Sequence, residues 1–300
     1  MSQPEALLLH DRADAASRAL PPLLVEAERI AATVVQGIHG RKRAGTGESF
    51  WQYRPYAFGD STARIDWRKS ARSAHVYIRE NEWEAANTLW LWASPSPAMN
   101  FKSHLANTTK RDRAYLMTLA LASLALRAQE RVGLIGSPRP AATTRSALGG
   151  MAAWLLQNEG SALPTRQNMK KFSTAVLIGD FFDDPRDIET AIRALAANGV
   201  SGHVIQMIDP AEEVLPYAGR VEFRDVEGPR KFLAGKTETL REAYAEKFKA
   251  QREAVNRIAN SVQWSFTAHH TDQSPASLLM RMHMLIGEAR AQSLGLGSPA

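Results

Sequence analysis

From about residue 84 onward, short apolar runs alternate along the chain with longer segments in which apolar residues recur at helical spacing. The short runs are typical of buried strands, and the longer segments are typical of helices. The expected strands are Thr88–Ala93, Arg131–Ile135, Ser173–Gly179, Gly202–Ile208 and Val262–Thr267, with a small hairpin over Val221–Arg224 and Lys231–Leu233. The expected helices are Lys110–Gln129, Arg145–Gln157, Arg186–Ala197, Thr237–Ala259 and Pro275–Leu285. Strands separated by helices of about ten residues or more pair in parallel through right-handed crossovers. The pattern therefore predicts a doubly wound, mostly parallel α/β sheet.

The residues before this alternation have a different pattern. Leu20–Ile38 carries apolar residues at helical spacing, and Pro21 and Pro22 suit the first turn of a helix. Gly40–Ser73 is rich in glycine, arginine and aromatic residues without a period, which indicates ordered loop and turn, and His75–Glu80 alternates like a strand. We predict three regions: residues 1–83 with the N-terminal helix and an extended segment, 84–290 with the α/β domain, and 291–300 as a disordered tail.

Composition excludes several classes of protein. The 300 residues are 44% hydrophobic and 23% charged, which supplies a core of ordinary size. The chain has no cysteine, which excludes disulfides, thiol nucleophiles and thiolate metal sites and fits a reducing compartment. The longest apolar stretch, Ala114–Leu126, is shorter than the roughly 20 residues that a membrane span needs. Glu5, Asp11 and Asp14 interrupt the first twenty residues, so we expect no secretory signal and a cytoplasmic protein.

Positive charge gathers in one part of the chain. Residues 40–80 contain nine lysines and arginines against four aspartates and glutamates, a net charge of +5, while the whole chain has +6. Such a block can form a surface for nucleic acid or for an acidic partner. Alternatively, the arginines pair with the neighbouring carboxylates and stack on the local aromatic rings. The sequence leaves both interpretations open.

Three closely spaced motifs occupy the same stretch. They are GTGESF at residues 45–50, RPYAFGD at 54–60 and RIDWRKSAR at 64–72. In these motifs the chain resembles the domain-of-unknown-function 58 family, and the similarity extends to about residue 270. The resemblance implies a fold of the von Willebrand factor A type and a partnership with MoxR-type AAA+ ATPases in chaperone-like assembly. It also implies partners among other proteins with von Willebrand A domains, and no enzymatic activity.

The fold that the resemblance implies usually carries a Mg²⁺ site, formed by D-x-S-x-S after the first strand and by a threonine and an aspartate from two further loops. Mg²⁺ requires an octahedral set of hard oxygens. Here Ser94 stands in place of the first aspartate and Ala98 in place of the second serine, whereas Ser96 and Asp180 match the pattern. The threonine would come from residues 143–144. We predict a degenerate metal site at Ser94, Ser96 and Asp180, partner binding that is independent of metal, and no cofactor; weak Mg²⁺ binding is not expected.

The motif residues are the first candidates for a functional surface. Their arginines can form bidentate pairs with carboxylates, and their aromatic rings offer stacking faces, so the segment is either a structural staple or a docking surface. The candidates are Arg54, Tyr56, Asp60, Asp66, Trp67, Arg68 and Arg72. The leading hypothesis is a non-catalytic interaction module that acts as an adaptor of a MoxR-type ATPase.

Two other functions are disfavoured alternatives. One is nucleic-acid binding through residues 41–79, which would weaken steeply with salt. The other is a divalent-metal hydrolase built on Asp180, Asp183 and Asp184, for which the sequence offers no acid–base partner. His269 and His270 lack the spacing of a metal site, and we expect them in an exposed loop.

Overall fold

The computed structural model describes residues 22–34, 52–56, 65, 67–73, 75–80, 88–158, 160–224 and 231–293. Contacts between residues divide the chain into two compact units. One unit comprises residues 1–38 and 87–300, and the other comprises residues 39–86.

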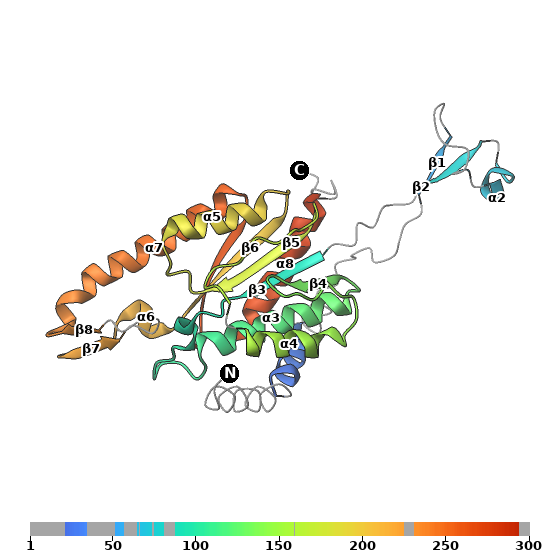
Figure 1. The fold of residues 1–300 in the computed structure, drawn as a ribbon. Coiled ribbons are helices and arrows are strands. Elements are labelled where there is room, and N and C mark those ends of the chain that lie inside the picture. Colours follow the sequence, from blue (N-terminus) through green and yellow to red (C-terminus); the bar gives the residue numbers. More distant parts are fainter. Residues whose placement is uncertain are drawn as a thin grey trace, which may run out of the picture. The chain divides into compact units, whose positions relative to one another are not determined.

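The larger unit is built on a five-stranded parallel sheet with the strand order β4-β3-β5-β6-β9 (Figure 1). Its strands are β3 (Thr88–Ala93), β4 (Arg131–Leu134), β5 (Thr174–Gly179), β6 (Ser201–Ile208) and β9 (Ser265–His270). All six residues of β5 are buried, as expected for a strand covered on both faces. The predicted doubly wound α/β class is confirmed.

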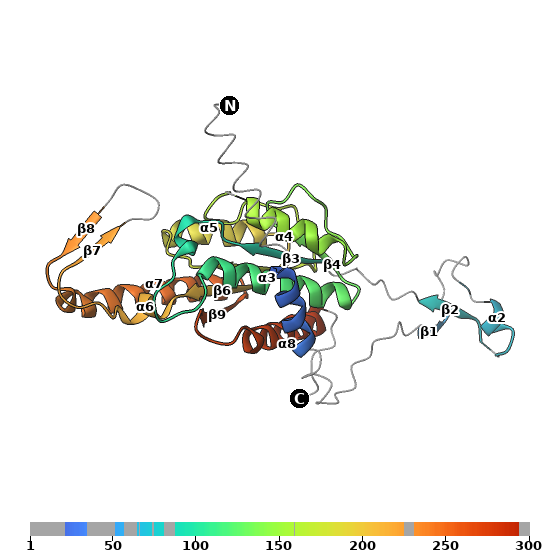
Figure 2. The same cartoon turned by 90° about the horizontal axis from the view of Figure 1, so that it is seen from below.

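Helices cover both faces of this sheet (Figures 1 and 2). One core contains side chains of the helix over residues 22–34, of α3 (Lys110–Arg127), of α4 (Ala147–Gln157) and of α8 (Pro275–Ser293). The opposite core contains side chains of α5 (Pro185–Ala196) and α7 (Arg241–Ser261). Helix α3 is buried along most of its length, because the sheet, α4 and α8 all pack against it. The remaining elements of this unit are η2 (Pro97–Asn100), α6 (Pro210–Val214), η3 (Thr237–Leu240) and the hairpin of β7 (Val221–Arg224) with β8 (Lys231–Ala234).

The smaller unit contains a short antiparallel ladder. Strand β1 (Gln52–Pro55) pairs with β2 (Tyr77–Glu80), and α2 (Trp67–Ser70) lies between them in sequence. The Ser70 hydroxyl accepts a hydrogen bond from the Tyr77 amide at 2.9 Å and so ties the helix to the strand. We expected loop and turn over Gly40–Ser73, but β1 and α2 lie within that range. Both elements have four residues, too few to show a period in the sequence.

The structure differs from the expected elements at other points. Strand β9 begins three residues later than expected and ends at His270, because Trp264 is buried against the core instead of pairing in the sheet. Helix α8 continues to Ser293, into the tail that we expected to be disordered. The short helix α6 was not expected, although Asp209-Pro210 and Glu212 form a capping box. The domain boundary that we predicted at residue 84 stays a prediction. The helix over residues 22–34, which we had placed in the N-terminal region, packs into the core of the α/β unit.

The close approach of Gly202 to Trp264 provides a test of core packing. A Cβ added at Gly202 would overlap the Trp264 ring, and that ring is fixed because it is 2% exposed and its Nε1 donates to the Val200 carbonyl at 2.9 Å. We expect Gly202→Ala to lower the free energy of unfolding by roughly 1–3 kcal/mol, measured by urea denaturation. The control is Gly149→Ala in α4, where a Cβ meets open space. That change should be neutral or add up to about 1 kcal/mol. Equal stability of the Gly202→Ala variant and the natural protein would contradict the packing described here.

Candidate functional site

The order of the strands marks one place in the larger unit where a ligand is expected. The chain runs from β3 to β4 in one direction and then returns to β5 on the other side of β3, so the switch point lies between β3 and β5. In open α/β sheets, ligands bind in the crevice at the carboxyl ends of the strands beside such a point. The loops that begin with Ser94 and Asp180 follow these two strands. The Ser94 amide donates to the Ile178 carbonyl at 2.8 Å, so the two loops lie side by side as the sequence predicts.

The serine hydroxyls of the predicted metal site bond to the backbone. Ser94 Oγ donates to the Ala162 carbonyl at 3.2 Å and accepts from the Ser96 amide at 3.3 Å. Ser96 Oγ accepts from the Ala98 amide at 3.1 Å and caps η2. Both side chains are buried, so these bonds shape the loop.

The third predicted residue, Asp180, belongs to a buried ion-pair cluster. Its Oδ2 lies 3.0 Å from the Nζ atom of Lys110, and Glu212 Oε1 lies 2.6 Å from the same nitrogen. Lys110 is the first residue of α3 and is only 1% exposed. We call Lys110, Asp180 and Glu212 the Lys110 cluster. Buried charges of this kind persist only when they are paired and hydrogen-bonded, so the three residues depend on one another.

Local structure holds each member of the Lys110 cluster in place. Helix α3 begins at Lys110 because the Thr109 hydroxyl accepts the Asp112 amide at 2.9 Å. Glu212 is the third residue of α6, and its Oε2 accepts the Asp209 amide at 2.9 Å in a capping box. Asp209 in turn accepts the amides of Ala211 at 2.9 Å and Ser103 at 2.8 Å, which fastens α6 to the loop before α3.

Burial changes the titration of groups around the cluster. Burial raises the pKa of Glu212, although the ammonium of Lys110 opposes this shift. The Tyr244 hydroxyl donates to the Glu212 carbonyl at 2.6 Å, and burial together with the charge of Glu212 raises the pKa of Tyr244 to about 12. Tyr244 is therefore a hydrogen-bond donor at neutral pH, not a base.

Aromatic rings lie next to the Lys110 cluster. The Lys110 nitrogen is 5.2 Å from the centroid of Phe182, and Phe182 lies 5.7 Å from Phe248 of α7. Phe181 has a φ of +52°, a left-handed conformation that costs energy outside glycine. Gln251 stabilises this turn by donating to the carbonyls of Phe181 at 2.8 Å and Asp183 at 2.9 Å. A strained turn therefore places the Phe182 ring beside the ammonium.

The three carboxylates of the hydrolase hypothesis have different surroundings. Asp180 pairs with Lys110, and Asp184 caps α5 by accepting the Arg186 amide at 2.8 Å. Asp183 contributes its carbonyl to the bond with Gln251. Among the residues that the structure describes, no group of three histidine, aspartate or glutamate side chains could hold a metal ion. Thr144, a candidate for the metal-site threonine, is exposed and bonds instead to the Ser146 hydroxyl at 2.9 Å.

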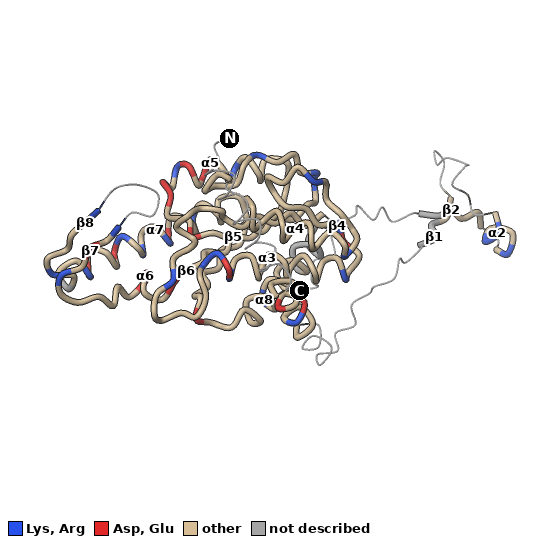
Figure 3. The backbone as a smooth tube through the Cα atoms, turned by 60° about the horizontal axis from the view of Figure 1, so that its bottom comes forward, with Lys and Arg blue, Asp and Glu red and all other residues tan. Residues whose placement is uncertain are grey.

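In the smaller unit, the described signature residues are exposed. Trp67 has 67% of its surface exposed and Tyr56 has 36%. Arg68 and Arg72 are exposed and form no ion pair with a side chain in the described part of the chain. Figure 3 shows these basic positions in and after α2. The Arg54 side chain and the predicted residues Asp60 and Asp66 lie outside the described residues.

Two of the three signature motifs, at residues 54–60 and 64–72, lie in a region that matches a known family. The family described as "Protein of unknown function DUF58" matches residues 52–254. The chain belongs to this family. It is similar to uncharacterized proteins of Mycobacterium tuberculosis and Mycobacterium bovis, each 25% identical over 264 residues that make up 80% of both chains.

Two solved structures resemble this DUF58 chain at lower similarity. One is an aerotolerance-related membrane protein of Bacteroides fragilis, with 12% identity and a TM-score of 0.41. The other is the conserved hypothetical protein BatB of Bacteroides thetaiotaomicron, with 12% identity and a TM-score of 0.39. Each match covers 67% of the DUF58 chain and 98% of the solved chain. In the described part of the DUF58 chain, no helix is both long and apolar enough to cross a membrane.

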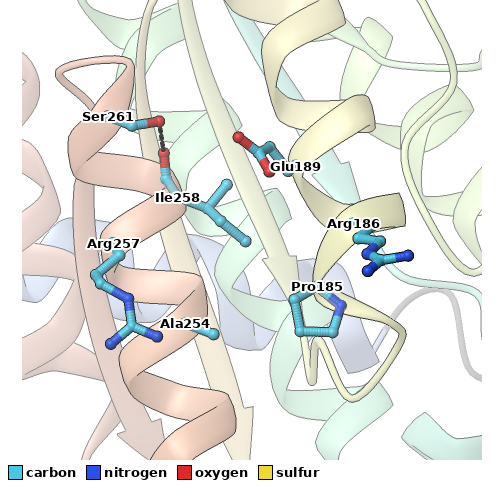
Figure 4. A pocket seen from close by; sticks show the side chains of 7 residues that line it. All are labelled: Pro185, Arg186, Glu189, Ala254, Arg257, Ile258 and Ser261. Atoms are coloured by element: carbon cyan, nitrogen blue, oxygen red, sulfur yellow. Dashed lines mark hydrogen bonds between the residues drawn. The ribbon is translucent and has the colours of Figure 1, made fainter.

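A groove of about 340 Å³ lies elsewhere on the larger unit, between α5 and α7 (Figure 4). The Ser261 hydroxyl in this groove donates to the Ile258 carbonyl at 2.8 Å. Glu189 pairs with Arg193 at 2.7 Å. The hydroxyl and the carboxylate of the groove thus have partners within their own helices, and the lining gives no reason to expect a reaction there.

Two histidines at the end of β9 are a feature that sequence reasoning misplaced. We expected them in an exposed loop, but they end a strand that pairs with β6. His269 is 4% exposed, and His270 Nε2 lies 2.6 Å from Glu213 Oε2. Burial, together with the charges of Arg113 and His270, lowers the pKa of His269 to about 4.

The buried His269 predicts a specific dependence of stability on pH. Its folded pKa lies below the unfolded value, so the neutral ring stabilises the protein above about pH 6.5, and this stabilisation is lost as the pH falls toward 4. We expect the loss to reach at most about 3 kcal/mol and to be reduced in a His269→Gln variant. The measurement is the free energy of unfolding by urea between pH 7 and pH 4. As a control, the substitution His104→Gln at an exposed position should leave the dependence of the unfolding free energy on pH unchanged. If the His269→Gln variant loses stability between pH 7 and pH 4 as steeply as the natural protein does, His269 is not the group responsible.

Proposed function

We propose that this DUF58 protein is a non-catalytic interaction module that docks onto its partner through the exposed signature residues of the smaller unit. The observation that carries the proposal is the exposure of Trp67 together with Arg68 and Arg72. Tryptophan and arginine supply a large share of binding energy in protein interfaces. Aromatic residues and arginine are also enriched at protein interfaces relative to the rest of the surface.

The closed strand-end edge supports a role without catalysis. The place where an α/β sheet would bind a substrate is filled by the Lys110 cluster, whose central nitrogen is shielded from solvent. An enzyme at this edge would need an accessible acid, base or nucleophile. The reactive groups at this edge are instead bonded to one another or to the backbone.

The partner class comes from the signature motifs. We propose a MoxR-type AAA+ ATPase as the partner, with other proteins that contain von Willebrand A domains as further partners, because these are the associations that the motifs imply. A basic surface suits an acidic face on the ATPase, and charge complementarity of this kind would speed association at low salt. The cytoplasmic location expected from the sequence is part of this proposal.

The test is binding of the purified MoxR-type ATPase from the same organism, measured by calorimetry or biolayer interferometry. We expect the Arg68→Ala/Arg72→Ala variant and the Trp67→Ala variant each to bind at least roughly tenfold more weakly, since tryptophans and arginines at the centre of an interface often contribute about 2 kcal/mol or more. EDTA should leave binding unchanged. Thermal melts must show that both variants remain folded.

A matched control removes the same charge from the larger unit. Arg139 and Arg145 are exposed there, and the Arg139→Ala/Arg145→Ala variant should bind the ATPase normally. Normal binding by the folded Arg68→Ala/Arg72→Ala variant would refute the docking surface. Binding of DNA or RNA that weakens steeply with salt and depends on Arg68 and Arg72 would favour the nucleic-acid alternative instead.

A further inference from the structure

The Lys110 cluster has the form of a cation site. One carboxylate oxygen from the loop after β5 and one from α6 converge on one point, at 3.0 and 2.6 Å from a positively charged nitrogen. Carboxylate oxygens are also the ligands that Mg²⁺ and Mn²⁺ prefer. The point lies at the carboxyl edge of the sheet, because Asp180 follows β5 and Glu212 lies in α6 after β6, and open α/β sheets bind ligands at this edge. A positive charge is therefore built into the position that a bound cation would take.

The residues present do not fit the Mg²⁺ ion that the fold resemblance implies. The ammonium of Lys110 stands between the two carboxylates. The hydroxyls of Ser94 and Ser96 bond to the backbone of their own and a neighbouring loop. A divalent ion could enter only by displacing a buried lysine, whose backbone is held at the capped start of α3.

We propose that the Lys110 ammonium is a covalently attached replacement for a divalent cation, and that it keeps the strand-end edge free of metal. The single charge of the ammonium balances one of two carboxylates. The Lys110 ammonium thus holds both the loop after β5 and helix α6 against α3, and unlike a metal ion it cannot dissociate.

The proposal has a consequence for variants that lack the ammonium. If Lys110 becomes alanine, the two carboxylates face a space about the size of the lost side chain, and a divalent ion with several waters can occupy it. Gln206 adds a neighbouring oxygen. Its Nε2 donates to the Asp180 carbonyl at 2.9 Å, while its buried Oε1 has no hydrogen-bond partner among the described residues.

The experiment compares thermal melts and Mn²⁺ binding, the latter by electron paramagnetic resonance, with millimolar Mn²⁺ or EDTA. For the natural protein we expect no bound Mn²⁺ and the same melting temperature in both solutions. The Lys110→Ala variant should melt several degrees lower in EDTA, because two buried carboxylates lose their partner. Mn²⁺ should restore part of the loss, with binding at least roughly tenfold tighter than in the natural protein.

Two controls separate a metal site from a general effect. Lys102→Ala removes an exposed lysine from the loop before α3. This change should leave the melting temperature as it is in the natural protein, with no response to Mn²⁺. The Lys110→Ala/Asp180→Asn/Glu212→Gln variant keeps the space but removes the two carboxylate charges. Its melting temperature should be the same with and without Mn²⁺. If Lys110→Ala fails to fold in EDTA, refolding in Mn²⁺ is the measurement, and the circular dichroism signal should recover.

Two results would overturn the proposal. One is a Mn²⁺ response of the natural protein that Asp180→Asn abolishes, because the ammonium would then not exclude metal. The other is a Lys110→Ala variant that neither binds nor is stabilised by Mn²⁺. This test does not involve the ATPase. A negative result would therefore not affect the proposed docking function, and failure of the docking test would not affect the proposal about Lys110.

Discussion

The interaction on which the functional end of the larger unit depends is the pairing of one buried lysine with two carboxylates. Lys110 opens α3, Asp180 follows β5, and Glu212 lies in α6, so one nitrogen joins segments 70 and 102 residues apart in sequence. Ions buried in this way are costly unless every partner is present. The pairing therefore constrains the loops at the carboxyl edge of the sheet to one arrangement. The strained turn at Phe181 and the capping box at Asp209 serve this arrangement by presenting Phe182 and Glu212 to the ammonium.

The cluster also explains why the two units suit different roles. An α/β sheet of this kind binds ligands at the carboxyl ends of its strands, and here the protein's own charges pair next to the ends of β5 and β6. In the smaller unit the described aromatic and basic side chains of α2 remain in water. The proposed docking function therefore falls to the signature residues, while the charges at the strand-end edge pair with one another.

The fold was largely predictable, because buried parallel strands and their helices leave strong periods in the sequence. Strand β3 was predicted at its observed bounds, β5 and β6 differ from the prediction by one residue at one end, and α5 differs by one residue at each end. Predictions failed where the signal is short or depends on distant contacts. Elements of four or five residues, such as α2 and α6, are shorter than any period that could reveal them. We predicted a loop for the two histidines that end β9, because polar residues rarely fill buried strand positions.

The candidate site divides in the same way. The sequence by itself determined that loops starting at Ser94 and Asp180 meet at the edge of a parallel sheet, because strand order and burial follow from apolar periodicity. It also placed Ser94 where the metal pattern implied by the resemblance has an aspartate. Only the tertiary structure decided which cation faces Asp180. Lys110 is the first of several charged residues at the start of a long apolar helix, and nothing in the local sequence distinguishes it from an exposed lysine. Its pairing with Glu212 arises because packing of α3 and α6 against the sheet brings charges from distant segments together out of water, where they can be stable only as partners.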